Sequence, residues 1–178
     1  QKILPDFECI PQSVFNISDV EETGKDFEEN AILKAKNAFT KTNISSVGDD
    51  SGLIVPAINN EPGLYSARYA GLNATDSDNR NKLISKLKDN KLESTYAYFF
   101  CCIVAVGIKD QNEIIVCDGK VEGEVRTIER GEKGFGYDPM FYPKGYSESF
   151  AELNSLEKNK ISHRGQALKK LMDKLNKT

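Results

Sequence analysis

The first strong signal along the chain is a helical spacing of apolar residues between positions 26 and 42. These residues share one face of a helix: Ala31, Ile32, Ala35, Ala38 and Phe39. Lys34 and the other lysines of this stretch fall on the opposite face. Asp26 precedes Glu29 by three residues, which matches a capping box, so a structural role is available to Glu29. We therefore predict a helix from Asp26 to about Thr42.

A short acidic motif follows this helix. The run from Ile44 to Val47, which has a β-branched residue at each end, predicts a strand, and Gly48 and Gly52 bound the acidic residues that come after it. We therefore expect a turn over Val47 to Leu53, after which Leu53 to Val55 forms another short strand.

Longer apolar segments predict the centre of the sheet. Tyr96 to Ile108 is apolar almost throughout, as expected of a central strand that is buried on both faces. Two strands follow, Glu113 to Asp118 and Val121 to Ile128, on either side of Gly119. This order suggests an antiparallel meander inside a mixed sheet.

Two more helices are expected from the same kind of spacing. One runs from about Asp76 to Lys88 and has Asp76 or Ser77 as its cap. The other runs from His163 to Leu175, with Ser162 as a plausible N-cap.

Composition narrows the class of protein. A chain of 178 residues is long enough for one domain, which we place at 1–178, and no apolar run has the roughly 18–20 residues of a membrane span. The net charge is −3 and the basic residues are scattered, which argues against binding to a nucleic-acid polymer.

Because the N-terminus shows no export signal, we expect a cytoplasmic protein. Four cysteines without metal-ligand spacing are interpreted as small apolar fillers in a reducing compartment: Cys9, Cys101, Cys102 and Cys117.

Three stretches carry residue types that structure alone seldom requires. The first is the acidic turn together with Glu29. The adjacent carboxylates Asp49 and Asp50 of this turn repel each other, and water, a basic partner or a hard divalent ion such as magnesium can relieve that repulsion. The second, Gly131 to Pro139, combines glycines with aromatic rings suited to a planar base. The third, Glu157 to Gly165, places basic residues at a helix start, where anions bind. Each stretch also has a purely structural alternative. The first could be a solvated turn, the second a loop that caps a strand, and the third a solvated basic turn.

Together the three stretches indicate a site for magnesium, a base and phosphates, and hence for a nucleoside triphosphate. No nucleophile elbow surrounds Ser51 and no Walker-type loop is present, so neither a serine hydrolase nor a P-loop enzyme is expected.

Six motifs occur in one order and resemble those of the Ham1-like, inosine triphosphate pyrophosphatase family. They are Glu22-Thr23-Gly24, Phe27-Glu28-Glu29-Asn30-Ala31, Asp49-Asp50-Ser51-Gly52-Leu53, Pro62-Gly63 with Tyr65-Ser66-Ala67-Arg68-Tyr69, Gly134-Phe135-Gly136-Tyr137-Asp138-Pro139, and Glu157-Lys158-Asn159 with Ile161-Ser162-His163-Arg164-Gly165. The resemblance implies an α/β fold, with a long mixed sheet and flanking helices forming two lobes around a central cleft. It also implies a homodimer that hydrolyses ITP, dITP and XTP to monophosphate and pyrophosphate with Mg²⁺.

The resemblance also assigns roles to residues. Asp50 matches the catalytic base, and Glu29, Asp49 and Asp50 match the metal site. The positions that match substrate contacts are Ser51, Phe135, Gly136, Tyr137, Asp138, Lys158, His163 and Arg164.

The start of the chain departs from the family pattern. Members open with a strand and a Thr-Gly-Asn-x-x-Lys-like phosphate loop, which this sequence lacks, so we expect an exposed sheet edge and weakened phosphate binding. This departure leaves a non-catalytic nucleotide-binding module as an alternative. The related Maf-like nucleotide pyrophosphatases are another, although the Ser-His-Arg-Gly segment argues against them.

Overall fold

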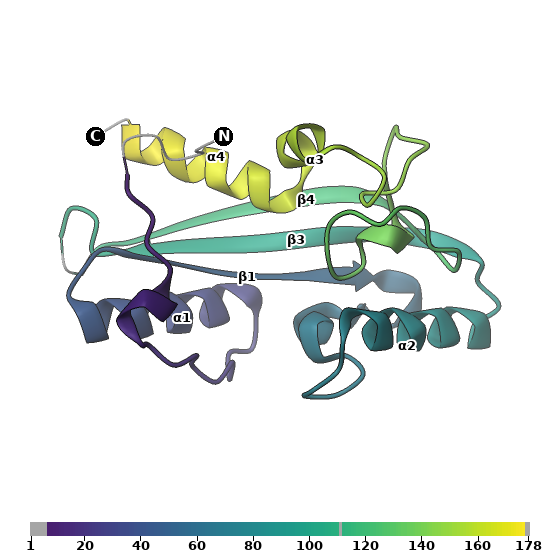
Figure 1. Cartoon of the computed structure of the whole chain (residues 1–178), viewed down its shortest axis with the longest axis horizontal. Coiled ribbons are helices and arrows are strands. Elements are labelled where there is room, and N and C mark those ends of the chain that lie inside the picture. The colour runs from purple at the N-terminus through teal and green to yellow at the C-terminus, as the bar shows by residue number, and fades with distance from the viewer. Residues whose placement is uncertain (1–6, 111, 177–178) are drawn as a thin grey trace. The chain divides into compact units, whose positions relative to one another are not determined.

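The computed structural model describes residues 7–110 and 112–176 and has an α/β fold (Figure 1). Its helices are α1 (Phe27–Thr42), α2 (Asp76–Asp89), α3 (Ser155–Ile161) and α4 (His163–Asn176). Its strands are β1 (Ser46–Val55), β2 (Glu61–Pro62), β3 (Ser94–Val106), β4 (Ile114–Arg126) and β5 (Phe141–Pro143), in the order β2-β1-β3-β4-β5. Four short 3-10 segments complete the described elements: Gln12–Phe15, Pro56–Ile58, Gly63–Arg68 and Asp138–Met140. The expected α/β class, with a sheet flanked by helices, is confirmed.

The described sheet is antiparallel, whereas a mixed sheet was expected. Ile54 of β1 lies opposite Pro62 of β2, and Gly123 of β4 lies opposite Pro143 of β5, each in an antiparallel pair. A short hairpin joins β3 to β4, in which the Gly107 amide donates to the Glu113 carbonyl at 3.2 Å. Such a hairpin returns the chain directly along its neighbour, which antiparallel pairing allows.

Strand β1 corrects the expectation of an acidic turn. It runs without a break through Asp49, Asp50 and Gly52, so the two predicted short strands are one. Gly48 does not mark a bend: a Cβ there would lie 2.6 Å from the Ala31 carbonyl oxygen. Glycine is needed inside this strand because the backbone of α1 approaches it closely.

Strand β4 corrects a second expected break in the same way. It is continuous from Ile114 to Arg126, and Gly119 is buried within it. The glycine was interpreted as a separator, but it occupies a buried position inside one continuous strand.

The chain divides into two compact units. Among the described residues, unit 1 holds 7–50, 101–110, 112–119 and 164–176, whereas unit 2 holds Ser51–Phe100 and Lys120–His163. Strands β1, β3 and β4 each contribute residues to both units.

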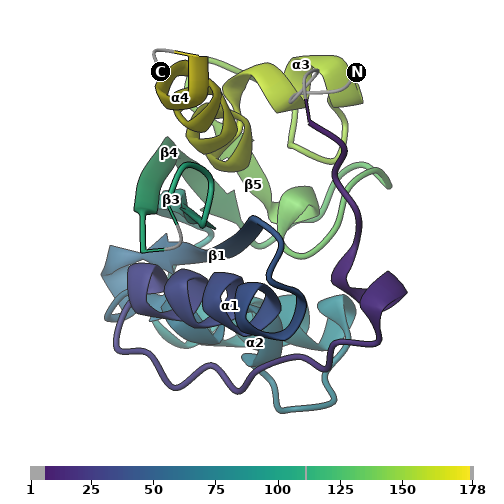
Figure 2. The same cartoon turned by 90° about the vertical axis from the view of Figure 1, so that its left-hand side faces the viewer.

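In unit 1, α1 and α4 cover opposite faces of the strands (Figure 2). Ala167 and Leu171 of α4 are fully buried in a hydrophobic cluster that includes Cys101, Ile103 and Cys117. These two buried cysteines and Cys102 act as the expected fillers, whereas Cys9 is exposed. Burial raises the pKa of the Cys101 thiol to about 12, which keeps it protonated and unreactive.

The start of α1 shows how its sequence signals are used. The Asp26 carboxylate accepts a hydrogen bond from the Glu29 amide at 2.8 Å, so Asp26 is the N-cap as predicted. The Glu29 carboxylate accepts from the Lys25 amide at 2.8 Å, one residue before the position that a capping box uses. Glu29 therefore has a structural role at this helix end.

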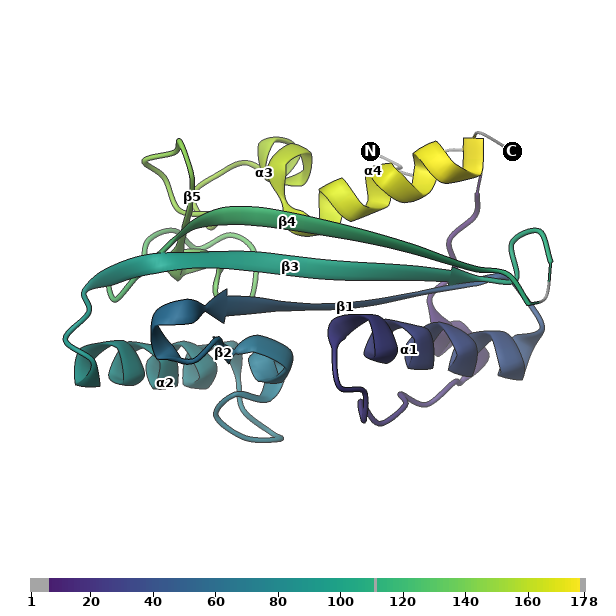
Figure 3. The ribbon, with the colours of Figure 1, turned by 180° about the vertical axis from the view of Figure 1, so that it is seen from behind.

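In unit 2, α2 and α3 lie on opposite sides of the strands (Figure 3). The aromatic rings of Phe99, Phe141 and Phe150 pack together, with Phe99 and Phe141 centroids 4.8 Å apart in an edge-on arrangement. Helix α2 begins after Thr75, which forms a capping box with Asp78, so neither of the two predicted caps is used.

Among the described residues, no helix is both long and apolar enough to cross a membrane.

The close contact at Gly48 gives a test of how α1 is seated. Gly48→Ala is expected to lower the free energy of unfolding by about 1–3 kcal/mol, because the added methyl group would overlap the backbone of Ala31 and Ala35. Urea denaturation measures this loss. The control is Val47→Ala at the adjacent exposed position, where a change within about 0.5 kcal/mol is expected. Equal stability of the two variants would contradict the packing.

Candidate active site

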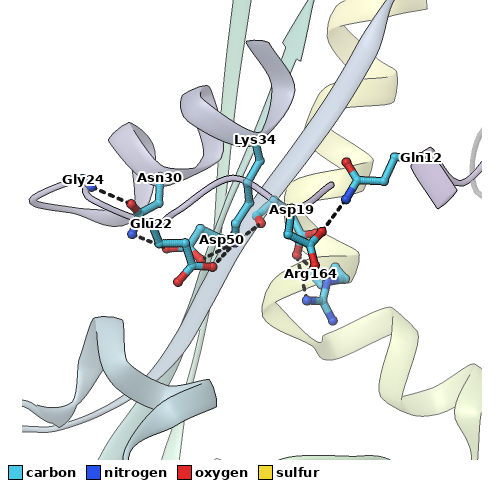
Figure 4. A network of polar contacts seen from close by, with 9 residues as sticks. Gln12, Asp19, Glu22, Gly24, Asn30, Lys34, Asp50 and Arg164 are labelled. Carbon is cyan, nitrogen blue, oxygen red and sulfur yellow. Dashed lines mark hydrogen bonds and ion pairs between the residues drawn. The ribbon is translucent and has the colours of Figure 1, made fainter. Parts of the chain in front are cut away.

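Asp50 is a carboxylate buried in β1 of unit 1, with only 6% of its surface exposed. The Asn30 side-chain amide donates to its Oδ2 at 3.1 Å, and the Lys34 ammonium donates to its Oδ1 at 2.8 Å (Figure 4). Both donors come from α1, one helical turn apart and therefore on the same face. A buried carboxylate needs such partners, since burial without them is costly.

Lys34 holds two carboxylates at once. Its ammonium lies 2.7 Å from Glu22 and 2.8 Å from Asp50 (Figure 4). Burial works against the charged lysine, but the hydrogen bonds to the two carboxylates outweigh it and raise the Lys34 pKa. Burial raises the pKa of Asp50, and Lys34 offsets that effect only in part. Lys34 therefore stays protonated, and it lies beside a carboxylate whose raised pKa makes it easier to protonate than an ordinary aspartate.

The segment before α1 supports this cluster. The Gly24 amide donates to the Asn30 side-chain oxygen at 2.8 Å, which leaves the Asn30 NH₂ group to face Asp50. A Cβ at Gly24 would lie 2.6 Å from that same Asn30 oxygen, so only glycine allows this approach. The Glu22-Thr23-Gly24 motif therefore supplies both an ion-pair partner and the orientation of an Asp50 ligand.

Asp49 has a different partner. Arg164, in the first turn of α4, donates to Asp49 Oδ2 from Nε at 3.0 Å and from Nη2 at 2.7 Å. Successive side chains of a strand point to opposite faces, so Asp49 turns toward α4 while Asp50 turns toward α1. Repulsion between the two carboxylates is therefore reduced by the strand itself, and a basic partner on each face completes the compensation.

The three carboxylates that the family pattern assigns to metal are not gathered into one site. Asp49 and Asp50 lie on opposite faces of β1, and Glu29 accepts from the Lys25 amide. Within residues 7–110 and 112–176, no group of three or more His, Cys, Asp or Glu side chains could hold a metal ion. The described part of the chain therefore offers no three-carboxylate cage.

The predicted base-binding residues lie in unit 2, around Asp138. This carboxylate is buried, accepts from the Phe135 amide at 2.8 Å, and forms an ion pair with Lys158 of α3. The Lys158 ammonium also sits 5.0 Å from the centroid of the Phe135 ring, in cation–π contact. Phe135 as a whole is 59% exposed. The loop therefore presents an aromatic face with a fixed ammonium beside it.

The remaining predicted contacts have mixed environments. Tyr137 points inward, and its hydroxyl donates to the Ser66 carbonyl at 2.9 Å; burial raises its pKa, so it stays neutral. His163 is also buried and stacks on Phe99 with centroids 4.7 Å apart. Ser51 follows Asp50 in β1 and is partly exposed. For these residues a substrate contact stays a prediction.

Sequence reasoning missed the partners of Asp50. Lys34 was assigned to the polar face of α1, yet it reaches the buried Asp50, and Asn30 was not singled out beyond its motif. The signal was present: Asn30 and Lys34 are four residues apart and each precedes a fully buried alanine, Ala31 and Ala35.

Comparison with known proteins shows the family of this chain. The family model for the Ham1 family matches residues 1–174. The chain belongs to the Ham1 family. Among relatives, it is 47% identical over 94% of its length to a dITP/XTP pyrophosphatase of Idiomarina loihiensis, of which 83% is covered. It is 44% identical over 96% of its length to the dITP/XTP pyrophosphatase of Coxiella burnetii, of which 86% is covered.

Solved structures agree with this membership of the Ham1 family. The structure of a HAM1 protein from Coxiella burnetii matches with a TM-score of 0.91 at 42% identity, covering 100% of this chain and 91% of that one. The Ham1 protein of Staphylococcus aureus matches with a TM-score of 0.87 at 43% identity, covering 98% and 89%. The resemblance inferred from the six motifs is confirmed.

The Lys34–Asp50 pair makes a prediction about stability and pH. Lys34→Met is expected to lower the free energy of unfolding at neutral pH by about 1–3 kcal/mol, because it leaves a buried carboxylate without its main donor. Without the ammonium, the folded-state pKa of Asp50 rises further above its unfolded value. The penalty is therefore full at neutral pH and is relieved as the pH falls through that folded pKa.

Urea denaturation at pH 7 and at about pH 4 measures this dependence. The control is Lys36→Met, an exposed position of the same helix, where little change is expected at either pH. A Lys34→Met penalty that does not shrink in acid would contradict the assigned pair.

Proposed function

We propose that this Ham1-family chain hydrolyses the non-standard purine nucleotides dITP, XTP and ITP to a nucleoside monophosphate and pyrophosphate. The observation that carries the proposal is the buried Asp50 carboxylate, which α1 holds at a defined position with a raised pKa. The relatives named dITP/XTP pyrophosphatase, which match nearly the whole chain, support the substrate class.

Asp50 acts as the general base. Its two oxygens take one hydrogen bond each from Asn30 and Lys34, and each oxygen keeps a lone pair that can accept from water. Asp50 removes a proton from that water as the oxygen forms a bond to the α-phosphorus. The bond from the α-phosphorus to the bridging oxygen breaks, and pyrophosphate leaves. A raised pKa makes the carboxylate a stronger base, and its fixed direction orients the water.

The Phe135 loop supplies base recognition. The Phe135 ring stacks on the purine, and the Lys158 ammonium donates to it. An ammonium can only donate, so it favours the 6-oxo acceptor of hypoxanthine and xanthine over the 6-amino donor of adenine. Asp138 fixes that ammonium and so fixes the direction of the donor.

Magnesium, a homodimer and a cytoplasmic location complete the proposal, with the family resemblance as their support. Mg²⁺ is usually bound through substrate phosphates and one or two carboxylates rather than by a protein cage, which is compatible with a chain that offers no three-carboxylate group in its described part. Chelation with EDTA is expected to abolish pyrophosphate release, and added Mg²⁺ is expected to restore it. Full activity in EDTA would refute the requirement.

Asp50→Asn tests the assigned base. The variant is expected to lose at least about 100-fold in kcat for dITP, because the amide cannot take the proton. The fold should be retained, but the unfolding midpoint should fall, because the amide offers a single oxygen acceptor to the two donors Asn30 and Lys34 and no longer compensates the lysine charge. Pyrophosphate release from dITP, XTP, dUTP and ATP measures the activity. The control is Asp118→Asn, an exposed carboxylate in β4. Undiminished turnover in Asp50→Asn would remove Asp50 from the mechanism.

The same residue predicts the acid limb of the pH profile. Because burial raises its pKa, kcat/KM is expected to fall with decreasing pH at a value above the ordinary range of aspartate. Lys34→Met removes the main group that opposes this shift, so the limb moves to still higher pH in that variant. Initial rates across a pH series measure the acid limb in the parent and in the variant. An acid limb at the same pH in both would show that Asp50 is not the essential base.

A further inference from the structure

Helix α2 holds both polar backbone groups of one residue in the base-recognition loop. The Asp76 carboxylate accepts from the Gly136 amide at 2.6 Å, and Arg80 Nη1 donates to the Gly136 carbonyl at 2.9 Å. Asp76 and Arg80 are four residues apart, so they project from one face of α2. These contacts join segments that are distant in sequence, and all three residues belong to unit 2.

Gly136 is the pivot of this loop. Its φ is +58°, in the left-handed region that favours glycine, and a Cβ there would meet no atom within 4 Å. The preceding residue, Phe135, is 59% exposed, whereas the following residue, Tyr137, is 3% exposed. The orientation of the Gly136 peptide groups therefore decides whether Phe135 faces outward while Tyr137 stays in the core.

Arg80 also holds the segment that leads into the loop. Its Nε lies 3.0 Å from the Glu129 carboxylate, an ion pair that is not aligned as a hydrogen bond, and its side chain is only 16% exposed. One guanidinium thus contacts the chain at Glu129 and again at Gly136. Two anchor points seven positions apart restrict the loop more than either would alone.

The Asp76 contact is not required to begin the helix. Thr75 and Asp78 form a complete capping box: Asp78 N donates to Thr75 Oγ1 at 3.2 Å, and Thr75 N donates to Asp78 Oδ2 at 2.8 Å. For the helix itself, Asp76 contributes only the modest stabilisation that any acidic residue in the first turn gains from the helix dipole. Its short bond to Gly136 is therefore a specific contact with the loop.

We propose that Asp76 and Arg80 are positioning residues that set the Phe135 ring for stacking on the purine. Inside the loop, Asp138 accepts from the Phe135 amide and pairs with Lys158. From helix α2, Asp76 and Arg80 bond the Gly136 backbone. The role rests on the proposed function, because it presumes that Phe135 contacts the base. Loss of the clamp weakens nucleotide binding and leaves the proton transfer at Asp50 unchanged.

The kinetic test uses Asp76→Ala, which removes the acceptor, and Asp76→Asn, which keeps one. For dITP, KM is expected to rise about three- to tenfold in Asp76→Ala with kcat within about twofold, and Asp76→Asn is expected to recover most of the loss. Arg80→Met should raise KM in the same way. The control is Asp89→Ala, which removes an exposed carboxylate from the other end of α2. A loss confined to kcat, or no difference between Asp76→Ala and Asp89→Ala, would overturn the positioning role.

A second measurement needs no substrate. Hydrogen exchange of the amides at positions 134–138 is expected to quicken in Asp76→Ala and to stay at the parent rate in Asp89→Ala. Unchanged exchange in Asp76→Ala would overturn the clamp whatever the activity. If the parent chain hydrolyses neither dITP nor XTP, the proposed function fails and the positioning role with it, while the exchange rates still decide whether α2 holds the loop.

Discussion

A carboxylate buried inside a strand is tolerated only if nearby groups compensate its charge. The surroundings of Asp50 meet that requirement. Asn30 and Lys34 must both reach it, so α1 must lie against β1 with one face turned toward the strand. Gly48 allows that approach because the helix backbone occupies the space of a side chain. Gly24 and Glu22 then complete the cluster from the segment before the helix. Several motif residues that are scattered in sequence are thus explained by one buried charge.

The same condition explains how the protein carries two adjacent acidic residues. Alternation along β1 sends Asp49 to Arg164 and Asp50 to Lys34, so each carboxylate has a cation of its own. Asp50 is deeply buried, which raises its pKa, whereas the Asp49 side chain is 40% exposed. Two residues of one type therefore acquire different chemistry from the face on which they lie.

Unit 2 uses a comparable principle in its recognition loop. Asp138 is buried and compensated by Lys158 and by the Phe135 amide, which folds the loop around a charge. The exposed Phe135 ring is a consequence of that arrangement, together with the left-handed Gly136. Rigid support under an exposed aromatic ring reduces the ordering cost when a flat ligand stacks on it.

The sequence by itself determined the elements whose signals are local. Helical spacing and the Asp26 cap predicted α1, the apolar run predicted β3, and the collinear motifs identified the family. Only the tertiary structure decided that the acidic pair lies within a strand, because glycine signals a turn and a close contact equally well until the neighbouring helix is known. It also decided that Lys34 donates a hydrogen bond to Asp50 and that Asp76 accepts one from the Gly136 amide. Such pairings depend on which faces meet across distant segments, and no local pattern encodes that.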